Sequence, residues 1–211
     1  LIAVEQAIER LRNKDCDMAV AAGIHLCQYP PFWFVFTHLG ALSSNGVIRP
    51  FDARADGLLL GEGAGAVTLK RWEDAYRDGD RIYAVIKGVG TSSDGNSKGV
   101  TAPNADGQLT ALRRAYREAG MSPARVGLIE AHGTGTMVGD PTEAKSLCDL
   151  FSEAQAPQQS CALGSVKSMI GHTKCAAGIA GLIKAALALH HKVLPPTVVE
   201  QPNPKIGLED S

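Results

Sequence analysis

The sequence predicts a layered α/β fold with parallel strands, on two observations. Apolar runs of strand length alternate with helix-like patterns along the 211 residues, and parallel strands need helices of this kind to connect them. In the second half the order strand, glycine turn, helix occurs twice, which indicates a repeated unit. With 45% hydrophobic residues, the chain can bury a substantial core as one domain or two.

The first half opens with a helix over residues 1–12, because apolar positions 1, 4, 8 and 11 recur at helical spacing. No capping residue precedes this helix and the chain opens on Leu1, so we expect a fragment of a larger protein. Apolar, aromatic and glycine patterns predict the other elements of this half: a buried strand at 17–24, a short helix at 30–42, a strand at 66–70 and a helical turn at 73–77.

The second half begins with a strand at 82–90 and an amphipathic helix at 106–119, which Gly120 ends and Pro123 follows. The repeated unit then predicts a strand at 126–131, a helix at 141–151, a strand at 161–166 and a buried helix at 173–191.

Composition excludes several classes of function. Lysine plus arginine (21) nearly balance aspartate plus glutamate (22), and no long basic run is present, so nucleic acid is not an expected partner. The longest apolar stretch, residues 176–189, contains Lys184 and is too short to span a bilayer. Five cysteines without zinc spacing fit reduced thiols, so we expect a cytoplasmic protein without a metal site.

Two glycine-rich loops are not expected to bind nucleotides. Gly61-Glu-Gly-Ala-Gly65 precedes a strand, whereas a dinucleotide loop precedes a helix. Gly90-Thr-Ser-Ser-Asp-Gly95 is followed by Asn96, where a phosphate loop has a lysine.

Two histidine-bearing segments carry the strongest functional signal: Glu130-Ala-His-Gly-Thr-Gly-Thr136 and Lys167-Ser-Met-Ile-Gly-His172. Each follows a short apolar run and places an imidazole beside glycines, where the backbone can approach a ligand closely. A single histidine in a turn is usually structural. Two in similar settings, with Lys167 nearby, predict that His132 and His172 point into one catalytic pocket.

Cys175 is the thiol nearest to these segments. It follows His172 by three residues near the start of a helix, where the helix dipole lowers the pKa of a thiol. We favour a packed, unreactive Cys175, because packed cysteines outnumber reactive ones. The remaining cysteines are expected to be structural: Cys16, Cys27, Cys148 and Cys161.

Three ordered motifs resemble the signatures of β-ketoacyl synthases, specifically the ketosynthase domains of type I polyketide synthases. They are Glu130-Ala-His-Gly-Thr-Gly-Thr136, Gly139-Asp-Pro-Thr-Glu143 and Gly164-Ser-Val-Lys-Ser-Met-Ile-Gly-His172. Shorter segments support the resemblance: Arg49-Pro-Phe-Asp52, Asp56-Gly57, Gly61-Glu-Gly63 and Thr101-Ala-Pro-Asn104. The resemblance spans essentially all 211 residues.

The resemblance implies a thiolase-like fold of two similar halves, layered α-β-α-β-α and truncated here at both ends. Residues 1 to about 72 would close the first half, and residues 73–211 would form most of the second. The family's nucleophilic cysteine precedes a segment similar to Leu1-Ile-Ala-Val, so it is expected upstream of Leu1. A glycine-rich loop that helps to form an oxyanion hole is also expected outside this chain, which would therefore be inactive alone.

The implied reaction is a decarboxylative Claisen condensation of an acyl thioester with a malonyl-type extender, in polyketide or fatty-acid biosynthesis. By resemblance, His132 and His172 stabilise the enolate, and Lys167 supports the site electrostatically. The resemblance also implies that Glu143 is a carboxylate behind the site. It implies that the hydroxyls of Thr134 and Thr136 bind the phosphopantetheine arm.

No directly bound cofactor is implied, because the substrates are carried on the phosphopantetheine of acyl carrier protein. The implied partners are that carrier, neighbouring domains such as an acyltransferase, and a second copy in a homodimer. Ser92-Ser-Asp-Gly95 and Ser168-Met-Ile-Gly-His172 further resemble iterative synthases of the polyunsaturated fatty acid and enediyne type. Met169 and Phe32-Trp33-Phe34 would line an acyl tunnel or pack in the core.

Two alternatives remain. An inactive homologue similar to a chain-length factor would serve as a partner in the assembly, and a glutamine in place of the upstream cysteine would indicate it. A degradative thiolase-like enzyme is disfavoured by the paired histidines and Lys167.

Overall fold

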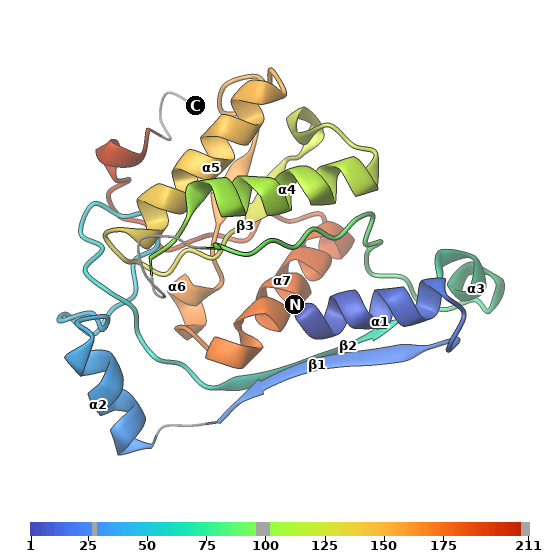
Figure 1. The fold of residues 1–211 in the computed structure, drawn as a ribbon, viewed down its shortest axis with the longest axis horizontal. Coiled ribbons are helices and arrows are strands. Elements are labelled where there is room, and N and C mark those ends of the chain that lie inside the picture. The colour runs from blue at the N-terminus through green and yellow to red at the C-terminus, as the bar shows by residue number, and fades with distance from the viewer. Residues whose placement is uncertain (27–28, 96–101, 208–211) are drawn as a thin grey trace.

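The computed structural model describes residues 1–26, 29–95 and 102–207 (Figure 1). Cys27, Asn96 and Thr101, on which some sequence interpretations depend, lie outside the described residues. The helices are α1 Ile2–Arg12, α2 Pro30–His38, α3 Trp72–Arg77, α4 Ala105–Ala119, α5 Gly139–Glu153, α6 Lys167–Ile170 and α7 Ala177–His191. The strands are β1 Ala19–His25, β2 Gly63–Leu69, β3 Leu128–Glu130 and β4 Ala162–Gly164. Short 3₁₀ turns lie at Pro123–Arg125, Lys174–Ala176 and Pro204–Ile206.

The elements form successive layers, as the α/β prediction requires. Figure 1 shows the β1–β2 ribbon, then α1 and α7, then β3 and β4, and then α4 and α5. Val4 of α1, Ala21 of β1 and Ile179 of α7 share one buried cluster, which joins the ribbon to the helices above it. Ala144 of α5 packs near Ile129 of β3 in a second cluster, so α5 covers the other sheet.

The two sheets differ in strand direction. β3 and β4 pair in parallel from Leu128↔Ala162 to Glu130↔Gly164, as expected. β1 and β2 pair antiparallel from Ala19↔Leu69 to His25↔Gly63, so the expectation of parallel pairing is wrong there. The connection through α2 reverses the chain, and the apolar pattern of a strand contains no information about its direction.

The strand expected at 82–90 is also wrong. A strand needs a hydrogen-bonded neighbour, and this segment pairs with none of the strands in the described residues. It runs instead against α4, where Cβ atoms added at Gly88 and Gly90 would lie 2.5 Å and 2.1 Å from the carbonyl oxygens of Ala115 and Ala111. The glycines therefore permit a close approach of backbone to helix.

The helix expected at 173–191 is divided, since a 3₁₀ turn precedes α7. Residues 176–189 nevertheless lie almost entirely in α7. In the described part of the chain, no helix has the length and apolar character needed to cross a membrane.

Candidate active site

The two histidines predicted to share a pocket meet in the structure. Their ring centroids lie 5.3 Å apart with the planes at 83°. His132 comes from the loop that follows β3, and His172 from the loop between α6 and α7. Because the imidazoles come from separate segments, the relative placement of these loops sets the geometry of the site.

The His132 loop is fixed by two carboxylates from the first turn and a half of α5. Glu143 accepts hydrogen bonds from the backbone N–H groups of His132 at 2.6 Å and Gly133 at 2.8 Å. Asp140 accepts from Thr134 N–H at 3.0 Å and Gly135 N–H at 3.1 Å. Both glycines have positive φ, 39° and 70°, which glycine adopts without steric cost.

Asp140 joins distant parts of the chain, a role that the sequence motifs do not reveal. Its second oxygen accepts a hydrogen bond from Phe51 N–H at 2.7 Å. The side chain is almost completely buried. Its signal in the sequence is an aspartate placed between a glycine and a proline at a helix start, which also fits an ordinary cap.

The His172 loop is fixed by backbone contacts to residues 59–61. His172 N–H donates to Leu59 at 2.7 Å, and Gly61 N–H donates to the His172 carbonyl at 3.1 Å. The ring atom Nδ1 accepts a hydrogen bond from Lys174 N–H at 3.0 Å. A neutral His172 therefore has its proton on Nε2, which leaves that nitrogen as a donor.

Both imidazoles are neutral near pH 7. Burial lowers the pKa of His132 to about 4, and the positive charges of Lys167 and Lys174 contribute to that shift. The His132 side chain is still accessible to solvent, although many protein atoms surround it. Burial, Lys174 and Lys167 lower the pKa of His172 to about 3. The site therefore presents neutral N–H donors beside two lysines.

Lys167 lies at the start of α6 and is 3% exposed. Burial lowers its pKa, while the carboxylates Glu143, Glu130 and Asp140 oppose that shift. Burial raises the pKa of Glu143, against the two backbone N–H groups from which it accepts. A buried lysine among carboxylates keeps a positive charge close to both imidazoles.

The two threonines expected to contact a phosphopantetheine arm bond to each other. Their Oγ1 atoms lie 3.0 Å apart, and Thr136 Oγ1 accepts from Gly139 N–H at 3.2 Å. Thr134 is buried and Thr136 is half-buried. These bonds stiffen the turn that follows His132.

Cys175 is exposed in the 3₁₀ turn before α7, so the interpretation of a packed cysteine is wrong. Its neighbour Lys174, which the sequence motifs do not single out, lies with Nζ 3.7 Å from the centre of the Phe36 ring. Burial lowers the pKa of Lys174 to about 8. Among the described residues, no group of histidine, cysteine, aspartate and glutamate could hold a metal ion.

The residues considered for an acyl tunnel lie in different surroundings. Phe32 and Trp33 pack against the buried cluster of Ile48, Leu58 and Leu60, which favours the core interpretation for them. Phe34 and Met169 are exposed.

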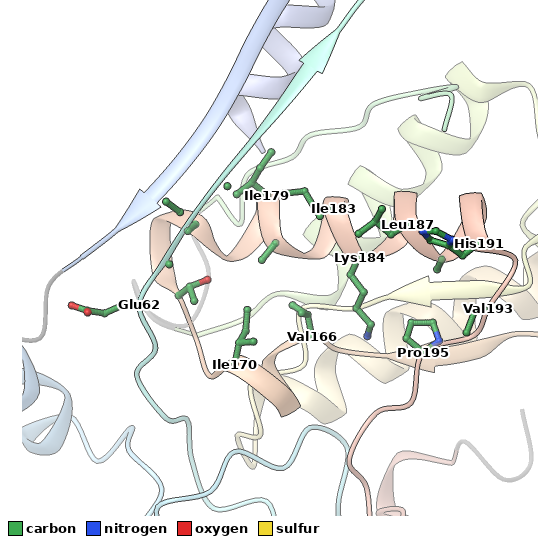
Figure 2. Close-up of a pocket in the computed structure, with 17 residues that line it drawn as sticks. Glu62, Val166, Ile170, Ile179, Ile183, Lys184, Leu187, His191, Val193 and Pro195 are labelled. Atoms are coloured by element: carbon green, nitrogen blue, oxygen red, sulfur yellow. The ribbon is translucent and has the colours of Figure 1, made fainter. Parts of the chain in front are cut away.

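One well-defined cavity is lined by neither His132 nor His172. Its volume is about 660 Å³, and it runs between β2, α7 and residues 193–195. Figure 2 shows its mainly apolar lining, including Ile179, Ile183 and Leu187, with Lys184 extending from α7 between Val166 and Pro195.

Comparison with known families gives two adjoining matches. The model described as "Beta-ketoacyl synthase, N-terminal domain" matches residues 1–75. The model described as "Beta-ketoacyl synthase, C-terminal domain" matches residues 83–200.

Individual relatives agree with these matches. A phenolphthiocerol/phthiocerol polyketide synthase component of Mycobacterium tuberculosis is 48% identical over the whole chain, which spans 11% of that protein. A polyunsaturated fatty acid synthase component of Thraustochytrium is 45% identical over 94% of the chain, which covers 7% of that protein. The solved ketosynthase from module 6 of the bacillaene synthase of Bacillus subtilis is 43% identical, with a TM-score of 0.94 over 97% of this chain and 37% of that one.

Proposed function

Because this chain belongs to the β-ketoacyl synthase family, we propose that it carries the decarboxylating part of a ketosynthase. The reaction is the condensation of an acyl thioester with a malonyl-type extender on acyl carrier protein. The observation that supports the proposal is the pair of neutral imidazoles, with centroids 5.3 Å apart, beside the buried Lys167.

The chemistry follows from the charge that develops. When the malonyl carboxylate leaves as CO₂, the electron pair of the broken C–C bond becomes an enolate on the thioester. N–H donors of His132 and His172 aimed at its oxygen stabilise that charge, and each such donor contributes about 10²–10³ in rate in other enzymes. The enolate carbon then attacks the acyl thioester, a C–C bond forms, and a thiolate leaves.

Lys167 and Glu143 support the donors. The positive charge of Lys167 favours neutral over protonated imidazoles and adds to the field that stabilises the enolate. Glu143 fixes the backbone of the His132 loop through two hydrogen bonds. Neither residue needs to contact the reacting atoms for these effects.

The acyl-accepting thiol is proposed to lie outside the chain, which would make the 211 residues inactive alone. Cys16, Cys148, Cys161 and Cys175 are the described cysteines, and none of them has a hydrogen bond to either histidine in the described structure. We further propose Thr134 and Thr136 as contacts of the phosphopantetheine arm, reached when their mutual hydrogen bond opens. The carrier protein, an acyltransferase domain and a second copy are the proposed partners, in the cytoplasm.

The proposed subtype is an iterative synthase of the polyunsaturated fatty acid or enediyne type. Ser168-Met-Ile-Gly-His172 and the 45% identity to a polyunsaturated fatty acid synthase support it. The 48% identity to a mycobacterial polyketide synthase gives comparable support to a different product class. Product analysis of the full-length protein with malonyl extender alone separates repeated from single extension.

Replacing either histidine tests the proposed function. In the full-length protein, His132→Ala or His172→Ala is expected to lower the rate of CO₂ release from malonyl carrier protein by about 10²–10³, because one enolate donor is lost. His190→Ala, in the last turn of α7 against Tyr83, is the matched control and should leave the rate unchanged. Undiminished CO₂ release in both active-site variants would contradict the proposal.

A further inference from the structure

The buried ion pair of Glu130 with Lys184 links β3, the start of α6 and α7. These are the elements next to the segments that carry His132, Lys167 and His172. Glu130 ends β3, two residues before His132. Its Oε1 accepts a hydrogen bond from Val166 N–H at 2.5 Å, one residue before Lys167. Its Oε2 lies 2.7 Å from Nζ of Lys184, in the helix that follows His172.

The pair is shielded from solvent. The side chains of Glu130 and Lys184 are 8% and 9% exposed. In the described ranges, neither Oε2 of Glu130 nor Nζ of Lys184 has another hydrogen-bond partner. Glu130 is therefore the direct counter-ion of Lys184, and its carboxylate also accepts from Val166 N–H and attracts the charge of Lys167.

Glycines make room for the pair. A Cβ atom at Gly181 would lie 3.2 Å from Cγ of Glu130, and one at Gly164 would lie 3.4 Å from Nζ of Lys184. Figure 2 shows Lys184 pointing away from the α7 axis toward Val166. The ion pair thus occupies the junction where α7 meets the ends of β3 and β4.

We propose that Glu130 and Lys184 form a positioning pair that fixes the His132, Lys167 and His172 segments relative to one another. This inference rests on the proposed function of that site. Glu130 joins β3 to the start of α6, and Lys184 joins both to α7. Neither residue touches the substrate in this role.

The physics of buried ion pairs predicts how variants behave. Removing one partner leaves the other charge buried and uncompensated, whereas neutralising both leaves no stranded charge. A segment displaced by about 1 Å costs catalysis about 10²-fold. Glu130→Gln keeps a side-chain oxygen that can accept from Val166 N–H. The double variant Glu130→Gln/Lys184→Met should therefore have a higher kcat than Lys184→Met alone.

The two single variants also act oppositely on Lys167. The charged and titratable groups that face Lys167 are Glu143 and Asp140 of α5, Glu130 of β3, and the two imidazoles. Glu130→Gln removes a negative charge and lowers the pKa of Lys167. Lys184→Met removes the direct counter-ion of Glu130, so the negative charge of Glu130 acts more strongly on Lys167 and raises that pKa.

The experiment measures CO₂ release from malonyl carrier protein by the full-length protein across pH. Expected results are a kcat loss of about tenfold or more in each single variant, with KM within about twofold and partial recovery in the double variant. The alkaline limb of the pH–rate profile, which follows the pKa of Lys167, should move to lower pH in Glu130→Gln and to higher pH in Lys184→Met. Lys145→Met, which breaks an exposed ion pair with Asp149, is the matched control and should change none of these quantities.

Thermal unfolding of each variant gives the folded fraction, so that kcat is expressed per folded molecule. Unchanged kcat per folded molecule, or limbs that move in the same direction, would overturn the positioning role. Wild-type protein that releases no CO₂ would instead overturn the proposed function, and this inference with it.

Discussion

The histidine loops and the β1–β2 ribbon are held in place by different forces. Directional hydrogen bonds fix both loops: the His132 loop bonds to buried carboxylates, as from Thr134 and Gly135 to Asp140, and the His172 loop bonds to the backbone of residues 59–61. The ribbon is fixed on one face by packing against α1 and α7, while Val20 and Ile24 on β1 remain 68% and 61% exposed. Geometry in the loops therefore depends on a few polar atoms, and geometry in the ribbon on many weak contacts.

Asp140→Ala should produce the largest change in stability, because it removes a carboxylate that fixes the His132 loop. Three backbone N–H groups, from Phe51, Thr134 and Gly135, would lose their acceptor. The expected cost is about 3–5 kcal/mol in the free energy of unfolding. Denaturant unfolding of the full-length protein measures it, and an unchanged midpoint would show that these bonds do not hold the loop.

The pH dependence of stability should also come from the histidine loops. The folded-state pKa values of His132 and His172, about 4 and about 3, lie below the unfolded value near 6.5. The unfolded state therefore takes up protons first, so the stabilising contribution is full above pH 6.5 and declines as pH falls toward 4. Replacing both histidines with glutamine should reduce this slope, and an unaltered slope in denaturant titrations would argue against rings that are neutral at pH 7.

Substitutions on the exposed face of the ribbon should have the smallest effect. Val20→Thr keeps the β-branched shape and changes an exposed side chain, so the free energy of unfolding should change by no more than about 0.5 kcal/mol. CO₂ release should equal that of the wild type. A marked loss of either would show that this face contacts a part of the full-length protein that the site requires.

The same contrast explains what the sequence could predict. Local signals sufficed for α4, where Asn104 accepts from two N–H groups of the first turn and Gly120 ends the helix at φ 62°. They also placed both histidines in glycine turns after apolar runs. Local signals could not give the antiparallel direction of β2 or the pairing of Glu130 with Lys184, because these depend on residues distant in the chain.

At residues 82–90 the sequence predicted a strand that the structure does not contain. Its apolar residues fit a strand, yet Gly88 and Gly90 place it against α4 without a hydrogen-bonded neighbour in the described structure. A sequence pattern indicates which residues are able to pair, and only the tertiary structure provides the partner.

The most direct test measures CO₂ release after every accessible thiol of the full-length protein has been alkylated and malonyl-pantetheine has then been added. If the two histidine loops contain the enolate-stabilising chemistry, CO₂ release persists without a free thiol and falls by about 10²–10³ in His132→Ala and His172→Ala. Release that disappears on alkylation of the wild type, or persists undiminished in both histidine variants, would contradict that claim.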